Sequence, residues 1–178
     1  MPKLKLIAAD SAALTASSTA TVMTKSDATT YELVWAPGAI PVDSLRGCIL
    51  RIKALVHATA TNSTDTLAAL LQVGKTGTMT TVASAAAYDN ANDDIHLLEA
   101  DIIFRSTTAF YAFGRAQYTG LTAPQLTTVK STTYDPASAF RVQVKCTWSS
   151  THAGNSCKVA ALWGEFLPLD PNVTAALS

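Results

Sequence analysis

The chain has few charged residues and no long apolar run. Asp, Glu, Lys and Arg make up 15% of its 178 residues, well below the quarter that is typical of soluble domains. Thirteen basic residues balance thirteen acidic ones, so no overall positive field is available to attract a phosphate backbone. No apolar segment reaches the roughly 18 to 20 residues that span a bilayer as a helix. We therefore expect neither direct nucleic-acid binding nor membrane insertion.

Cysteine is scarce, and no cleaved secretion signal is expected. Cys48, Cys146 and Cys157 are an odd number without Cys-x-x-Cys spacing, which does not match a secreted disulfide framework or a metal motif. The apolar patch near the first residues ends at Asp10, too early for the core of a secretory signal. These features are typical of a protein made in a reducing cytoplasm.

Helical periodicity is also missing, and the dominant period is two. Residues 140–148 alternate apolar and polar side chains, and residues 48–56 do the same. The alternation also predicts strands at residues 66–73, 98–105, 110–118 and 156–166, with weaker candidates at 19–24, 31–35 and 126–133. The Ala-rich run 83–87 is too short for more than one helical turn. The chain is predicted to be all-β, with eight to nine strands.

Strands that are apolar on one face are satisfied by two sheets packed face to face. We predict a two-sheet antiparallel β-sandwich of the jelly-roll type, with a closed barrel as the alternative. Residues 140–148 and 156–166 are expected to form one antiparallel hairpin, and residues 48–56 and 66–73 a second. The connectors at residues 74–94 and 119–125 suit crossings between the sheets.

The chain divides into three parts by composition. Residues 1–30 are rich in Ala, Ser and Thr and are predicted to form an N-terminal interaction arm, residues 31–166 the sandwich, and residues 167–178 a C-terminal tail. Ala and Thr supply roughly a third of the whole sequence, which favours a surface of small neutral side chains that lies against other protein.

Residues that could carry catalysis or bind a metal are scattered. His57, His96 and His152 lie on an outward strand position, a strand start and a loop, so each is predicted to be a surface histidine. Glu99 and Asp101 share an outward face about one pleat repeat, roughly 7 Å, apart, which two catalytic carboxylates could use, but exposed strands commonly carry such pairs. With no Gly-x-Ser-x-Gly and no zinc-ligand spacing, we expect no enzyme activity, no metal and no cofactor.

Two loops resemble ligand motifs only superficially. Residues 92–94, Asn-Asp-Asp, could gather oxygen ligands for calcium but lack the ordered Asp-x-Asp-x-Asp-Gly spacing, so an acidic solvated turn is predicted. Residues 74–78 contain Gly-Lys-Thr without the preceding glycine of a phosphate loop, and are predicted to be a turn.

Aromatic residues and two cysteines leave alternatives open. Trp35, Trp148 and Trp163 are predicted to anchor the core, and four tyrosines are candidates for sugar-binding platforms. These are Tyr88, Tyr111, Tyr118 and Tyr134. Cys146 and Cys157 flank the last predicted hairpin and would lie opposite each other if its turn centres near residue 151 or 152. They are expected to be buried free thiols, or a disulfide formed after release from the cell.

Several stretches of the sequence together resemble a known class of viral module. They are residues 45–54 (LRGCILRIKA), 62–74 (NSTDTLAALLQVG), 98–105 (LEADIIFR), 142–149 (VQVKCTWS) and 155–156 (NS). Their order is similar to that in jelly-roll modules of tailed-bacteriophage virions, found in capsid decoration (cement) proteins, head fibres and tail proteins. The chain lacks the long fibrous extension of a fibre, which favours a compact decoration protein.

The resemblance implies a structural role without catalytic residues. A decoration protein of this kind would be a homotrimer on the outer surface of an icosahedral phage head, where it bridges subunits of the major capsid protein. It would be made in the host cytoplasm and end in the virion. We expect the capsid-contacting segment at residues 3–13, where Leu4, Leu6 and Ile7 could add a strand to an open sheet edge.

Two other functions are compatible with such a sandwich. A carbohydrate- or receptor-binding module of a phage tail or head fibre would carry exposed aromatic residues beside carboxylates. A coat protein that encloses nucleic acid directly would carry a basic inner arm, whereas this N-terminus offers only Lys3, Lys5 and Lys25.

Overall fold

The computed structural model describes most of residues 48–168 and four short segments before them. The described residues are 5–7, 14–15, 21–23, 32–35, 48–60, 64–89, 94–106, 108–133, 135–150, 152 and 155–168. They form strands, turns, bends and short irregular stretches, without a helix. None of them belongs to a helix that could cross a membrane.

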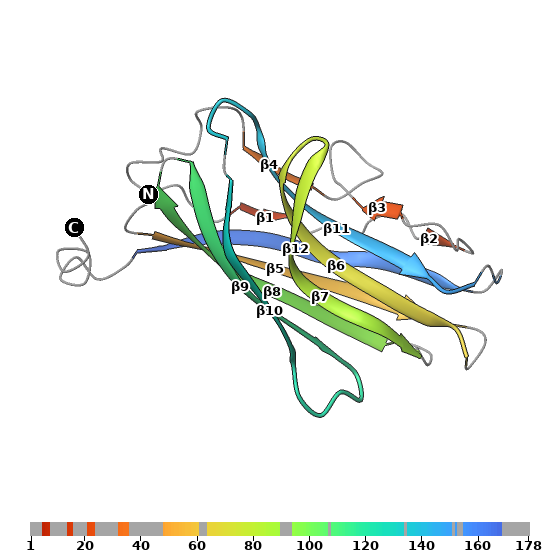
Figure 1. The fold of residues 1–178 in the computed structure, drawn as a ribbon. Coiled ribbons are helices and arrows are strands. Elements are labelled where there is room, and N and C mark those ends of the chain that lie inside the picture. The colour runs from red at the N-terminus through yellow and green to blue at the C-terminus, as the bar shows by residue number, and fades with distance from the viewer. Residues whose placement is uncertain are drawn as a thin grey trace.

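Eight strands of nine residues or more make up the body of the fold (Figure 1). They are β5 (Cys48–Thr59), β6 (Thr66–Lys75), β7 (Thr78–Asp89), β8 (Asp94–Ser106), β9 (Ala109–Tyr118), β10 (Gln125–Thr133), β11 (Phe140–Trp148) and β12 (Ser156–Pro168). Four short strands precede them: β1 (Lys5–Ile7), β2 (Leu14–Thr15), β3 (Thr21–Met23) and β4 (Glu32–Trp35). The predicted boundaries of β11 are those observed.

The strands form two antiparallel sheets. The larger sheet has the order β1-β12-β5-β8-β9-β10, and β2 also pairs with β12. The smaller sheet has the order β3-β11-β6-β7, and β4 also pairs with β11. The prediction of an all-β, two-sheet antiparallel sandwich is confirmed. β5 pairs with β12 in one sheet and β6 with β11 in the other, as in the outer strands of a jelly roll, whereas β7 extends the smaller sheet and β8 to β10 form a meander in the larger one.

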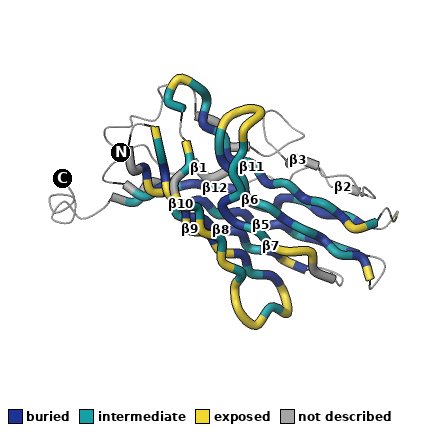
Figure 2. Tube along the Cα trace, in the orientation of Figure 1, coloured by how far each residue is buried: buried dark blue, intermediate teal, exposed yellow. Residues whose placement is uncertain are grey.

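The core lies between the sheets and follows directly from the alternation in the sequence. β11 and β6 each alternate buried and half-buried residues along their length, and Figure 2 shows the buried positions running along the middle of the long strands. Phe104, Phe110 and Phe140 pack together with ring centroids 5.8 to 6.3 Å apart. Because three strands meet in this cluster, it joins the larger sheet to β11 of the smaller one.

Both predicted hairpins are wrong, because their strands lie in different sheets. The chain crosses from β5 in the larger sheet to β6 in the smaller sheet through residues 60–65, and back from β11 to β12 through residues 149–155. Alternation shows that a strand buries one face, but it does not identify the neighbouring strand. Connectors of six or seven residues are long enough to cover the roughly 10 Å between packed sheets.

The connectors predicted at residues 74–94 and 119–125 are also different in the structure. Residues 78–89 are β7, joined to β6 by a tight turn at residues 76–77, so the turn predicted there is confirmed. The run Ala83–Ala87 is strand rather than a helical turn. Residues 119–124 connect β9 and β10 within one sheet, and the crossings before and after this meander use residues 90–93 and 134–139.

An irregularity in β12 changes which of its side chains face the core. The pairing of β12 with β5 shifts between Val159 and Ala161. Val159 and Leu162 are therefore both buried, and Trp163 is half-buried. Trp148 is buried in the core as predicted, whereas Trp163 does not anchor it. The side chain of Trp35 lies outside the described residues.

Candidate functional site

The outward side chains of β5, β8, β9 and β10 form one face of the larger sheet, which we call the outer face. Antiparallel pairing fixes which residues are neighbours on it. Ile103 lies between Ile49 and Tyr111, and Phe113 lies opposite Asp101. Register therefore brings together residues more than 60 positions apart in the sequence.

Ion pairs run across the centre of the outer face. Arg51 donates two hydrogen bonds to Asp101, at 2.7 and 3.0 Å between the guanidinium nitrogens and the carboxylate oxygens. Lys53 Nζ lies 2.5 Å from Glu99 Oε1, and Arg115 Nε donates to the other oxygen of Glu99. The hydrogen bond to Asp101 raises the pKa of Arg51.

Glu99 is the most enclosed member of this network. Its position faces outward, yet it is only 6% exposed, because Lys53 and Arg115 cover it from both neighbouring strands. Burial acts to raise the pKa of Glu99, but hydrogen bonds from the two cations outweigh it and the pKa is lowered. Both carboxylates of the predicted outward pair, Glu99 and Asp101, are thus paired with basic side chains.

Apolar side chains surround these ion pairs. Every large hydrophobic side chain that is exposed among the described residues lies on the outer face: Ile95, Ile103, Tyr111, Phe113 and Leu126, with exposed fractions of 37 to 63%. Along each strand, these residues occupy the positions between the core residues. A search of the sequence for apolar residues at such outward positions would therefore have found them. Exposed apolar side chains grouped with polar ones are typical of interaction surfaces.

A shallow hollow lies among the charged residues of the outer face. It has a volume of about 130 Å³, and Phe113 and Arg115 form part of its wall. The other lining residues are Arg51, Glu99, Ala100 and Asp101. Guanidinium groups and carboxylates beside an aromatic ring can bind and orient polar groups, but the lining contains no Ser, Cys or His as a nucleophile or proton shuttle.

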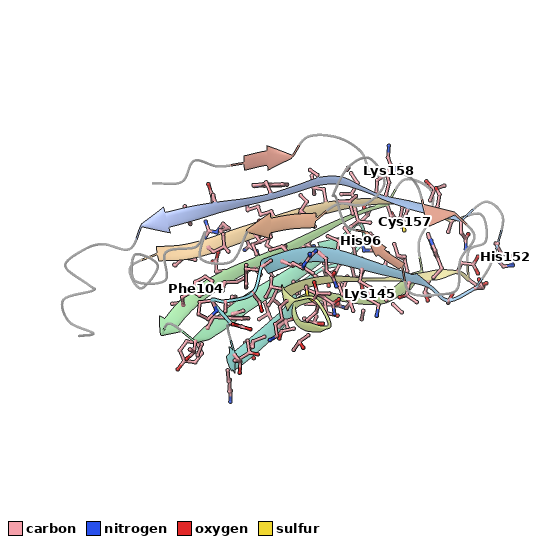
Figure 3. All side chains as sticks on the ribbon, turned by 90° about the horizontal axis from the view of Figure 1, so that it is seen from above. His96, Phe104, Lys145, His152, Cys157 and Lys158 are labelled. Atoms are coloured by element: carbon pink, nitrogen blue, oxygen red, sulfur yellow. The ribbon has the colours of Figure 1, made fainter. Side chains whose placement is uncertain are left out.

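A second polar cluster ties together the two crossings at one end of the sandwich. Asp65 is 3% exposed and accepts hydrogen bonds from Ser150 Oγ, from His152 Nδ1 and, at 2.8 Å, from Asn155 Nδ2. Hydrogen bonds, that from Ser150 foremost, lower the pKa of Asp65 to about 2. Figure 3 shows His152 at this end and Phe104 towards the opposite one.

The Asp65 cluster contains the residue types of a catalytic triad without its geometry. In a triad, Asp and Ser bind opposite nitrogens of the imidazole. Here Ser150 Oγ and Asp65 both lie on the Nδ1 side of His152, with Ser150 at 3.5 Å, and Ser150 donates to Asp65. His152 therefore does not lie between Ser150 and Asp65 as the base of a triad would, and the cluster is a hydrogen-bonded corner.

All three histidines were predicted to lie on the surface, and one of them does not. His57 is half-buried on the outer face, and His152 is exposed. His96 is fully buried and packs on Tyr118 with ring centroids 5.5 Å apart, so its predicted surface position is wrong. Asp94 is also buried, at 4% exposed, so the prediction of a solvated acidic turn at residues 92–94 is wrong for this residue.

The other predicted site residues are placed as follows. Leu6 and Ile7 lie on β1 and pair with Trp163 and Leu162 of β12 in the same chain. Leu4, Tyr134 and the side chain of Tyr88 lie outside the described residues. Of the sugar-platform candidates that are described, Tyr111 is exposed and Tyr118 is buried.

Cys146 and Cys157 come from opposite sheets and meet in the core. Cys146 lies on β11 and Cys157 on β12, each no more than 1% exposed, and both are free thiols in this structure. Sheet packing, and not a shared hairpin, brings them together. A hydrogen bond between the two thiols, together with burial, raises the pKa of Cys146.

The fold is a two-sheet β-sandwich, and one face of its larger sheet carries exposed apolar side chains around ion pairs. Among the described residues, no three His, Cys, Asp or Glu side chains converge as metal ligands would. The sequence matches no protein-family model, and comparison with curated proteins found no relative.

Proposed function

We propose that this chain is a structural virion protein, a capsid decoration protein that binds the outer surface of an icosahedral phage head and stabilises it by bridging subunits of the major capsid protein. The observation that carries the proposal is the outer face, where all the exposed large hydrophobic side chains of the described residues gather around paired charges. Such a face suits a protein that acts by contact.

The outer face is suited to binding because covering it costs little. Its side chains stand on paired strands, and the charged groups at its centre already have partners. Binding another protein there would therefore immobilise few side chains and would not bury an unpaired charge at the centre. Glu99 in particular is already buried before any partner binds. Binding would therefore retain most of the gain from burying the apolar side chains.

We assign the outer face to contacts between copies of this chain in a homotrimer. Its central charges are of both signs and are paired, so another copy of the chain could cover them without burying an unpaired charge. Arg51 pairs with Asp101, and Lys53 and Arg115 both pair with Glu99. The N-terminal segment with Leu4, Leu6 and Ile7 is then left as the contact to the capsid.

The native mass of the full chain, followed by co-sedimentation with phage heads that lack the protein, tests this proposal. We expect a trimer of about 56 kDa, three times the 18.7 kDa chain, that saturates the heads. The double variant Phe113→Ser, Leu126→Gln should be monomeric. Leu70→Gln, on the outward side of β6 in the smaller sheet, is the matched control and should remain trimeric. A wild-type monomer that does not sediment with the heads contradicts the proposal.

A carbohydrate- or receptor-binding role is the second candidate, and one observation favours it. Phe113 is 51% exposed beside the hollow that contains Asp101 and Arg51, and an aromatic ring next to a carboxylate is the combination that sugar binding would use. Screening the isolated protein on a glycan array tests it. Binding that is lost in Phe113→Ala and kept in Leu126→Gln would favour this role over the structural one.

A further inference from the structure

Cys146 and Cys157 form a facing pair of thiols inside the sandwich. Cys146 is opposite Ala69 on β6, and Cys157 is opposite Ala58 on β5. Both side chains point into the core from the two sheets, and the thiols are within hydrogen-bonding reach of each other. Packed sheets lie about 10 Å apart, and small neighbours such as these alanines let them approach more closely.

The pair lies where a covalent link would join the two sheets. β11 and β12 are in different sheets and are connected by residues 149–155. We propose that Cys146 and Cys157 are the site of an inter-sheet disulfide, which forms when the protein meets an oxidising environment. This inference does not depend on the function proposed above.

The third cysteine is too distant to compete. Cys48 is at the start of β5, where it pairs with Pro168, whereas Cys157 pairs with Ala58 near the other end of the same strand. Ten residues of strand separate Cys48 from Ala58, about 33 Å at 3.3 Å per residue. Within one chain, the fold therefore selects a single cysteine pair.

The oxidation can be written with a small-molecule disulfide such as oxidised glutathione. The thiolate of one cysteine attacks a glutathione sulfur, releases one glutathione thiol and leaves a mixed disulfide. The thiolate of the second cysteine attacks the protein sulfur and releases the second glutathione. Two protein thiols are oxidised, one glutathione disulfide is reduced, and the two protons end on the released thiols.

Burial makes this reaction slow in the folded protein. Neither thiol is accessible, and the raised pKa of Cys146 disfavours the thiolate that must attack. The test therefore uses the full chain refolded in glutathione buffers of graded redox ratio. Incubation continues until the oxidised fraction is the same whether the protein starts reduced or oxidised.

Tryptic mapping gives a direct readout, because Lys145 and Lys158 place both cysteines in one peptide, residues 146–158. In oxidising buffer we expect this peptide to be lighter by two hydrogen atoms and unmodified by iodoacetamide, while Cys48 is alkylated. Cys48→Ala should behave like the wild type, and Cys157→Ala should lose the effect. Two alkylated cysteines in the wild-type peptide at the most oxidising ratio, or glutathione adducts alone, would overturn the proposal, even if Cys157→Ala fails to fold.

Discussion

Gly114 is the residue at which the two sheets approach most closely among the described glycines. It lies in β9 of the larger sheet, and a β-carbon built on it would be 1.7 Å from the backbone oxygen of Val82 in β7. Backbone atoms cannot swing aside as a side chain can. The glycine is therefore required by the space between the sheets and not by an unusual backbone conformation.

We predict that Gly114→Ala strongly destabilises the fold. Even one methyl group would force β7 and β9 apart, and the loss should reach or exceed about 3 kcal/mol, the upper end for overpacking. Gly77→Ala is the control, since Gly77 has φ +82° with open space around it, and should cost about 1 to 2 kcal/mol of backbone strain. Urea unfolding measures both, and equal losses would contradict the steric explanation.

His96 is a buried base held in its neutral form. Burial lowers its pKa from 6.5 to about 4, although the charge of Asp94 acts in the opposite direction. The unfolded chain therefore binds a proton at His96 between these pH values while the folded chain does not. The contribution of neutral His96 to the free energy of unfolding is therefore fully present above about pH 6.5, and it is lost as the pH falls towards 4.

The expected loss from His96 over this window is about 3 kcal/mol, at 1.36 kcal/mol for each pKa unit. Urea unfolding of the wild type between pH 7 and pH 4 should show it. His96→Leu should flatten the profile in this range, whereas His57→Gln, on the outer face, should keep the wild-type slope. A wild-type profile that His96→Leu leaves unchanged would show that His96 is not the titrating group.

At the scale of elements, hydrogen bonds at the ends of β6 and β11 hold together the two crossings between the sheets. Beyond the β6–β11 ladder, the Ser149 N–H donates to the Thr66 carbonyl oxygen, and the Ser149 hydroxyl accepts from the Thr66 N–H, both at 2.9 Å. Together with the Asp65 cluster, these bonds join the β5–β6 crossing to the β11–β12 crossing. The two connectors that were expected to be hairpin turns form one hydrogen-bonded corner.

We predict that Asp65→Asn weakens this corner. An amide can still accept at its oxygen, but its NH₂ group would face donors from Ser150, His152 or Asn155. The variant should lower the urea midpoint more than Asp135→Asn, whose carboxylate also has three donors but is one-third exposed. The Asp65 carboxylate contributes stability above about pH 3.8, and this is lost as the pH falls towards 2. An equal effect of the two variants would contradict the assigned role.

β7 and β10 are edge strands of the two sheets and lie next to each other. Hydrogen bonds that involve side chains connect them, whereas a closed barrel would have a ladder of backbone hydrogen bonds at this place. The Ala86 N–H donates to Gln125 Oε1 at 2.7 Å, and the hydroxyls of Thr80 and Thr132 lie 3.4 Å apart. These contacts protect two edge strands without closing the sheets into one. They explain why the sandwich, and not the barrel, describes the fold.

For the whole molecule, a deletion of the N-terminal segment can separate the proposed capsid contact from folding and assembly. Its β1 pairs with β12, an edge of the long-stranded body of the larger sheet. We predict that deletion of residues 2–13 leaves the sandwich folded and trimeric but abolishes co-sedimentation with phage heads. Circular dichroism and native mass serve as controls for folding and assembly. Unchanged sedimentation would exclude this segment as the capsid contact.

Much of the element pattern could be read from the sequence, but not the pairing of the elements. Alternation correctly located β5, β6, β8, β9, β11 and β12 and most core positions on them. It missed β7, whose Ala-, Ser- and Thr-rich sequence has little contrast between its two faces. It also misplaced Trp163, because the irregularity after Val159 shifts the parity by one residue.

The sequence by itself determined that the chain is all-β, because a side-chain period of two is a local property of each strand. It also determined which face of most strands is buried. Only the tertiary structure decided which strands are neighbours, which brought Lys53, Glu99 and Arg115 into one network, buried His96, and set Cys146 against Cys157 across the core. The physical reason is that register and sheet packing depend on contacts between residues far apart in the chain, which no local pattern contains.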